Sequence, residues 1–194
     1  MTDLDAWLTF AVGSSETEPG GEEGGWNPTD PSPENPTWRG IEFEEYCDWL
    51  VIDPFSLPFS AFRLSCTRTR IGQIAGQNYW QKFRVDLLPS GPNVLFMDGV
   101  FNGGGVENLQ VAMNEIWPPF PPLQTDDVFG PLTLTAMGQY LPTANAYDLI
   151  GIYAAVAEAR YRELAKQPRF APHLDGWLGR LGRCKALALG LVTA

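Results

Sequence analysis

The chain has 194 residues and a formal net charge of −10, with 44% hydrophobic and 12% aromatic residues. This length suits one domain, or one domain with a small appended subdomain, and the composition excludes global disorder, collagen, coiled coils and disulfide scaffolds. No apolar run approaches the roughly 20 residues that cross a bilayer, so we expect no membrane span. Because residues 1–12 contain no Lys or Arg, we expect no secretory signal.

Acidic residues are concentrated in the first quarter of the chain. Residues 1–53 hold 13 of the 23 acidic residues and one basic residue, Arg39, whereas the remainder holds 10 acidic and 12 basic residues. This distribution lacks the basic surface of a nucleic-acid-binding protein, so we expect no nucleic-acid partner. The acidic region is either a solvated negative surface or the setting of a carboxylate active site.

The metal-binding residue types are few and widely spaced. The three cysteines (Cys47, Cys66 and Cys184) form no close pair, and His173 is the single histidine. We therefore expect no metal and no cofactor. An odd number of cysteines fits reduced, buried thiols made in a cytoplasm.

Hydrophobic spacing predicts a mostly α fold. A helix is expected over residues 3–12, followed by a Gly/Pro-rich loop over 13–40 that is either irregular or holds a small β-hairpin near 26–40. Residues 13–22 contain no large apolar residue, so we expect them to be peripheral and removable. Further helices are expected over 43–52, 60–66, 69–83, 92–101, 106–116, 132–140, 148–165 and 174–192, with a Pro-rich connector at 118–122.

Glu23-Gly24-Gly25-Trp26 is the strongest chemical candidate. Glycines allow close approach to the backbone, and an aromatic ring beside a carboxyl group can desolvate it, as a general acid at a glycosidic oxygen requires. Carbohydrate rings also stack on Trp faces. Glycoside hydrolysis needs a second carboxylate or a positioned water, and Asp30 and Thr37 are candidates for these. The alternative for Glu23 is a solvated loop acid.

The other candidates have structural alternatives. Asp30 is either catalytic or an Asx-type turn cap, and Thr37 either orients a water or serves the hairpin. Trp38 either lines a sugar cleft, as expected for Trp26, or belongs to the core. Asn102, which precedes three glycines, is either a substrate contact or a helix C-cap.

A series of segments, in this order, carries a resemblance to a known family. The chain has Glu23 to Trp26, an acidic Pro-rich stretch, Thr37 to Glu42, Tyr79-Trp80, Phe101 to Gly104 and Asp126 to Thr133. It resembles the lysozyme-like muramidases of glycoside hydrolase family 108, whose pattern is a helix, Glu-Gly-Gly-Tyr, an Asp/Pro-rich stretch and Thr-x-x-Gly-Ile-Thr. Relative to that pattern, Gly13 to Glu22 looks like an insertion, the second acid is displaced, and Asp127 stands where Gly is usual.

The resemblance implies a lysozyme-like helical fold and a peptidoglycan hydrolase of the phage endolysin type. Residues 1–117 would form the muramidase domain, and residues 123–194 a peptidoglycan-binding-like helical segment packed on it. The enzyme would cleave the β-1,4 bond between N-acetylmuramic acid and N-acetylglucosamine, with Glu23, Asp30 and Thr37 as catalytic residues and Trp26, Trp38 and Asn102 as substrate-binding residues.

The same resemblance implies peptidoglycan as the partner, with phage virion proteins as further candidates. The protein would be made in the host cytoplasm and reach the wall or periplasm through a holin or another signal-less route, or on a virion. The alternative is a non-catalytic wall-binding or virion structural component on a degenerate muramidase fold.

Overall fold

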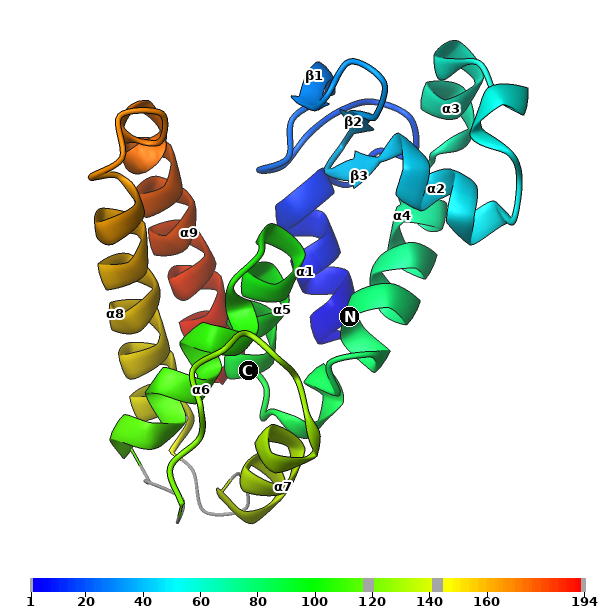
Figure 1. Cartoon of the computed structure of the whole chain (residues 1–194). Helices are drawn as coiled ribbons and strands as arrows, with labels where there is room; N and C mark the ends of the chain where they lie inside the picture. The colour runs from blue at the N-terminus through cyan, green and yellow to red at the C-terminus, as the bar shows by residue number, and fades with distance from the viewer. Residues whose placement is uncertain (1, 117–120, 141–144, 193–194) are drawn as a thin grey trace. The chain divides into compact units, whose positions relative to one another are not determined.

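The chain forms two compact units, residues 1–78 and 79–194, in a computed structural model that describes residues 2–116, 121–140 and 145–192. The described residues are mostly α-helical with one three-stranded antiparallel sheet, which confirms the predicted fold class (Figure 1).

In the first unit, a helix, a small sheet and three further helices follow one another. These elements are α1 (Asp3–Val12), β1 (Trp26–Pro31), β2 (Pro36–Trp38), β3 (Ile41–Glu42), α2 (Phe43–Leu50), α3 (Phe59–Ser65) and α4 (Arg68–Ile74). The sheet order is β1-β2-β3, and both strand pairs are antiparallel. The predicted hairpin near 26–40 is thus confirmed, and the two-residue strand β3 extends it.

The helix predicted over 69–83 has the expected position but changes its hydrogen-bonding pattern midway. After α4 the chain continues as a π-helical segment over Ala75–Gln81, within which the two units meet in sequence. The spacing of apolar residues predicts which face of a helix is buried. It does not predict a local change from α-helical to π-helical hydrogen bonding, so this change is not expected from the sequence.

The core of the first unit is built from α1, α2, α3 and α4. Trp7, Tyr46, Phe62 and Ile71 are each fully buried. Helix α1 begins with a capping box, in which Thr2 and Asp5 satisfy each other's backbone N–H groups. This cap stabilises the N-terminus of α1.

In its described residues, the second unit contains five α-helices. They are α5 (Pro92–Asn102), α6 (Gly105–Ile116), α7 (Pro131–Tyr140), α8 (Ala146–Leu164) and α9 (Leu174–Val192), with short 3₁₀ turns at Val85–Leu87 and Ala171–His173. Helices α8 and α9 lie side by side (Figure 1). Proline at the first position of α5 and of α7, and the Asn145 cap of α8, mark helix starts as these residue types favour.

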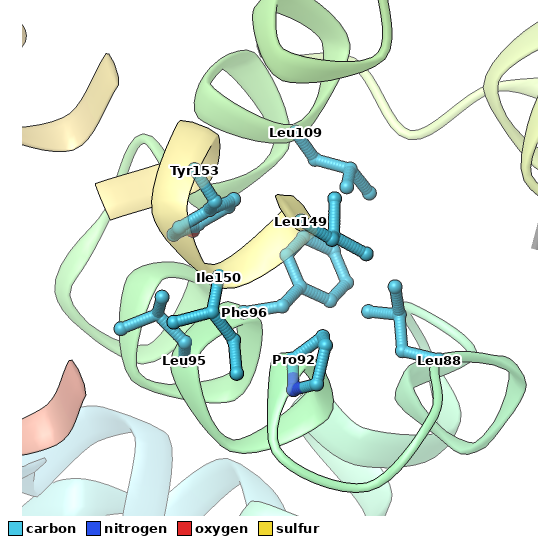
Figure 2. Close-up of a pocket in the computed structure, with 8 residues that line it drawn as sticks. All are labelled: Leu88, Pro92, Leu95, Phe96, Leu109, Leu149, Ile150 and Tyr153. Carbon is cyan, nitrogen blue, oxygen red and sulfur yellow. The ribbon is translucent and has the colours of Figure 1, made fainter. Parts of the chain in front are cut away.

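Helix α5 lies at the centre of this unit, because all residues from Pro92 to Val100 are buried. This confirms the prediction from its nearly continuous apolar sequence. Figure 2 shows Phe96 pointing into a cluster of apolar side chains that come mainly from α5, α6 and α8. The side chains that line this cluster are Leu88, Pro92, Leu95, Phe96, Leu109, Leu149, Ile150 and Tyr153.

A partly buried ion pair ties α5 to α9. The guanidinium of Arg180 donates to both carboxylate oxygens of Asp98, at 3.0 and 2.6 Å. Such two-pronged pairing fixes the relative orientation of two side chains as well as their distance. It therefore sets how α9 lies against the central helix.

The predicted peptidoglycan-binding-like motif, Asp126 to Thr133, folds around one buried amide. Gln110 of α6 donates to Asp126, to the Val128 carbonyl and to Thr133 at 3.0–3.2 Å, and its own oxygen accepts from the backbone of the loop. Asp127 has φ +58, which explains why glycine suits this position. Its carboxylate accepts from the N–H of Glu107 at 3.0 Å, in the first turn of α6.

The predicted division into domains 1–117 and 123–194 stays a prediction. Residues 118–120 of the predicted connector lie outside the described residues.

Close packing of α5 against α8 predicts a stability difference between two glycines. A Cβ on Gly99 would overlap the Tyr153 hydroxyl and lie 3.0 Å from the Gly105 Cα. We expect Gly99→Ala to lower the free energy of unfolding by about 1–3 kcal/mol, as overpacking does. Gly151→Ala in α8 is the control, because nothing lies within 4 Å of its Cβ position. It should be neutral or stabilising by up to about 1 kcal/mol. Urea unfolding measures both, and equal stabilities would contradict the packing.

Candidate active site

The end of helix α1 positions Glu23. The backbone N–H groups of Glu22 and Glu23 donate to the carbonyls of Phe10 and Ala11, at 3.0 and 2.8 Å. These carbonyls belong to the last turn of the helix, which has no intrahelical donors left for them. Glu23 therefore stands at the end of the first helix in space, although residues 13–22 lie between them in the sequence.

The segment that follows α1, residues 13–22, leaves the helix and returns to it. A Cβ on Gly13 would lie 3.1 Å from the Gly20 Cα, so the two ends of the excursion touch. At Gly21, where φ is +68, a Cβ would lie 2.5 Å from the Phe10 carbonyl oxygen and 2.6 Å from that of Ala11. Only glycine allows the chain to pass this close to the helix end.

The Glu23 side chain is partly removed from water. The residue is half-buried, and its carboxylate oxygen Oε1 is buried from solvent. Partial burial disfavours the charged form of a carboxyl group relative to the neutral form.

A buried arginine joins the sheet to the end of α1. Arg39 and Gly40 form the two-residue turn between β2 and β3, and both have positive φ, as a type I′ turn requires. The Arg39 side chain is fully buried and donates to the carbonyls of Val12, Ser15 and Glu16 at 2.7, 2.8 and 2.9 Å. Burial lowers the pKa of this guanidinium, which nevertheless stays protonated in proteins.

Residues 13–22 are peripheral, as expected, and their removal stays a prediction that several contacts oppose. These residues are largely exposed, but Glu16 also holds the start of α4. Its carboxylate accepts from the backbone N–H and the hydroxyl of Thr69, and these hydrogen bonds lower the pKa of the Glu16 carboxyl. The segment is therefore part of the framework, for a reason that a search for large apolar residues cannot detect.

The sheet places the two candidate tryptophans opposite each other. Trp26 of β1 pairs in register with Trp38 of β2, and Asn27 pairs with Thr37. Trp38 is 6% exposed, so the core alternative describes it better than an open cleft wall. Trp26 is half-buried and packs against Phe59 and Phe62, with ring centroids 6.0 and 6.4 Å apart.

Arg63 of α3 contacts both tryptophans. Its guanidinium carbon lies 5.2 Å from the Trp26 ring centroid and 5.2 Å from that of Trp38, within the range of cation–π attraction. Arg63, Trp38, Thr17, Glu18, Ser60 and Leu64 line a groove of about 410 Å³, called the Arg63 groove below.

Thr37 and Asp30 differ in their placement. Thr37 is half-buried in the central strand, between Asn27 and Glu42. Asp30 is exposed near the far end of β1, in the irregular part of the strand, where Asn27 pairs with Thr37 but Pro31 already pairs with the adjacent Pro36. The nearest partner found for its carboxylate is the Asn27 amide, at 3.4 Å. The catalytic roles of both residues stay predictions.

Asn102 belongs to the second unit. It is the last residue of α5, is exposed, and donates from Nδ2 to the Asp98 carbonyl at 2.8 Å. This is a helix-end contact, as the C-cap alternative predicts, and a role in substrate binding stays a prediction.

An apolar groove of about 590 Å³ lies elsewhere on the first unit. Phe55 is fully exposed and Phe59 is 38% exposed at this surface, and Glu34 and Glu44 flank it. Because Phe59 also contacts Trp26, exposed aromatic surface extends from β1 to this groove. Neither this groove nor the roles of Arg39 and Arg63 follow from local sequence, although Arg39 stands out there as the single base in an acidic region.

The described residues contain no group of three or more His, Cys, Asp and Glu side chains that could hold a metal. The three cysteines are buried and unbridged, and burial raises the pKa of the Cys66 thiol to about 12. Among the helices of the described part of the chain, none is both long enough and apolar enough to cross a membrane.

Comparison with known proteins relates the fold to one solved bacterial structure. SagA of Brucella abortus matches with a TM-score of 0.64 and 24% sequence identity, over 88% of this chain and 88% of that one. At this identity the likeness shows a shared fold. No protein-family model matches the chain. The curated proteins contain no match either.

The close return at Gly21 predicts a difference between adjacent glycines. Gly21→Ala forces a Cβ against two carbonyl oxygens and should lower the free energy of unfolding by about 1–3 kcal/mol, because both the packing and the positive φ oppose it. Gly20→Ala is the matched control, since its Cβ would meet only ordinary contacts at 3.6 Å and beyond. Thermal unfolding of both variants checks this, and equal melting temperatures would mean that the return is not tightly packed.

The Arg39 contacts predict that lysine cannot replace this arginine. A lysine is a single point donor and cannot span three carbonyls as the planar guanidinium does. We expect Arg39→Lys to cost about 2–4 kcal/mol, since a buried acceptor left unsatisfied costs about 1–3 kcal/mol. Arg63→Lys, at an exposed position, should stay within about 0.5 kcal/mol of wild type. Chemical denaturation gives both values, and cleavage by a protease within residues 13–20 should accelerate in Arg39→Lys alone.

Proposed function

We propose that the protein is a peptidoglycan hydrolase, an N-acetylmuramidase that cleaves the β-1,4 bond between N-acetylmuramic acid and N-acetylglucosamine. The observation that carries this proposal is the placement of Glu23. It stands at the end of α1, has one buried carboxylate oxygen, and leads through Gly24 and Gly25 directly into the strand that holds Trp26. The fold shared with SagA and the lysozyme-like sequence pattern are consistent with it.

In this mechanism Glu23 donates a proton to the glycosidic oxygen as the bond breaks. A general acid must hold its proton at the working pH, and partial burial favours that form. As the leaving sugar departs, a carboxylate or a water must stabilise or trap the positively charged sugar. Thr37, half-buried in the central strand, is our preferred residue to orient that water, and Asp30 is the alternative.

The aromatic surface of the first unit supports a glycan substrate. Trp26 and Phe59 form a continuous partly exposed surface, on which the apolar faces of sugar rings can stack. We place Trp26 in direct contact with the glycan, and Trp38 behind it as the residue that orients the sheet. Asn102, in the second unit, is a separate candidate contact for the substrate.

We further propose that the enzyme serves host-wall degradation of the phage type, with peptidoglycan as its partner. A non-catalytic wall-binding component is the rival function. The exposure of Asp30, whose nearest partner among the described residues is the Asn27 amide at 3.4 Å, is the observation that favours the rival, because a solvated carboxylate is not held in place for catalysis.

Substitution of Glu23 by glutamine tests the proposed chemistry. Glu23→Gln keeps the size and hydrogen-bonding capacity of the side chain but cannot supply the proton. General acid catalysis contributes about 10²–10⁴-fold in rate, so we expect lysis of outer-membrane-stripped Gram-negative cells to fall by about that factor, with thermal stability nearly unchanged.

Asp48→Asn, at an exposed acid of α2, serves as a control in the same acidic region of the sequence, and lysis should persist in it. Equal lysis by wild type and Glu23→Gln would exclude Glu23 from the mechanism. Wall binding without lysis by the wild type, on walls from several hosts, would establish the rival function instead. Asp30→Asn should reduce lysis less than Glu23→Gln if Thr37 holds the water.

A further inference from the structure

Arg63 differs from the other basic residues of its unit. Residues 1–78 contain 13 acidic residues and four arginines, with no lysine. Arg39, Arg68 and Arg70 each donate to backbone or hydroxyl oxygens of the protein. Arg63 is exposed and, within the described part of the chain, makes no hydrogen bond or ion pair; its contacts are the faces of two indole rings.

These indole contacts orient the guanidinium without using its donors. The guanidinium has five N–H donors, and Arg63 donates none of them to another residue in the described part of the chain. These donors thus remain available to bind a carboxylate through two parallel hydrogen bonds. Because the two indole contacts already restrict the Arg63 side chain, it loses little conformational freedom when it binds a ligand.

The Arg63 groove also presents a negative charge. Glu18 lines the same groove. No hydrogen bond or ion pair to its carboxylate is found among the residues that the structure describes, so Glu18 and Arg63 do not neutralise each other. The groove therefore offers one cation and one anion, together with Trp38 as apolar lining. Glu18 belongs to the excursion between Gly13 and Gly20, which therefore supplies this wall.

We propose that the Arg63 groove binds a free amino-acid group of the substrate, with Arg63 on its carboxylate and Glu18 on its ammonium. This inference rests on the proposed function and names the part of the substrate that the groove recognises. Peptidoglycan carries such a group wherever the peptide attached to the glycan holds a diamino acid whose second amino and carboxyl groups are free. A ligand with both charges also fits the surroundings, because the acidic excess of the unit disfavours a simple anion.

Binding of a soluble muropeptide to variants in a Glu23→Gln background tests the proposal without turnover. The probe is a disaccharide-peptide that contains diaminopimelic acid, used in three forms: unmodified, amidated at the diaminopimelate carboxylate that adjoins the free amine, and acetylated at that amine. Isothermal titration calorimetry should show that Arg63→Gln weakens binding of the unmodified form by about 10–100-fold, the range of one charge-assisted hydrogen-bonded contact. With the amidated form, the parent and Arg63→Gln should differ in affinity by less than about twofold, as for an exposed charge without a partner.

Glu18→Gln should show the complementary pattern, with a loss for the unmodified form that disappears when the amine is acetylated. Arg169→Gln is the matched control, because Arg169 is an exposed arginine that also lies over an aromatic ring, Phe170, in the other unit. It should leave binding of all three forms unchanged. Circular dichroism establishes that each variant is folded before titration.

Equal affinity of the parent and Arg63→Gln for the unmodified probe would overturn the proposal. So would a loss in Arg63→Gln that persists when the carboxylate is amidated, because that result means a structural role. The proposed hydrolysis is measured separately with Glu23 intact. If the protein shows the expected binding pattern but no hydrolysis, the muramidase function is excluded and the amino-acid site stands. If it hydrolyses the substrate without the binding pattern, only the amino-acid site is excluded.

Discussion

The arrangement of the first unit depends on one buried guanidinium at the end of a helix. Arg39 reaches three carbonyls that belong to the last residue of α1 and to the excursion that follows it. No carboxylate lies within ion-pair distance of it in the described residues, so its charge is balanced by carbonyl dipoles, including the negative end of α1. Because Arg39 also forms the β2–β3 turn, the helix end, the excursion and the sheet keep a fixed relation. The position of Glu23 relative to Trp26 follows from that relation.

The helices are predictable from sequence because their apolar residues are local and periodic. Helix α5 is an example, since its nearly unbroken apolar run corresponds to burial on all sides. The Glu23 motif also lies at the end of the first helix as predicted, although residues 13–22 intervene. Two features make that placement possible: the return of the chain at Gly21 and the hydrogen bonds of Arg39. Both join residues that are far apart in sequence, so no local sequence pattern predicts them.

Other features are hidden from the sequence for the same reason. The contact of Arg63 with two tryptophans from different strands exists only once the sheet and α3 are in place. Residues 13–22 seemed removable because they lack large side chains, yet their contribution comes from backbone carbonyls and from one carboxylate. Asp127 shows the converse: it departs from the family pattern at a glycine position, keeps the left-handed backbone, and adds a hydrogen bond to α6 that glycine lacks.

The excursion between Gly13 and Gly20 has two parts, which contact the rest of the unit through different atoms. Its first part, through Glu16, serves the framework mainly with backbone carbonyls, which are indifferent to side-chain identity except at Glu16 itself. Thr17 and Glu18 instead present side chains to the Arg63 groove. Because the ends of the excursion touch, its tip can change in residue type without displacing the catalytic candidate. If the Arg63 groove binds the substrate as proposed, substrate preference and folding are separated within a few consecutive residues, and the segment can change its specificity at little risk to the fold.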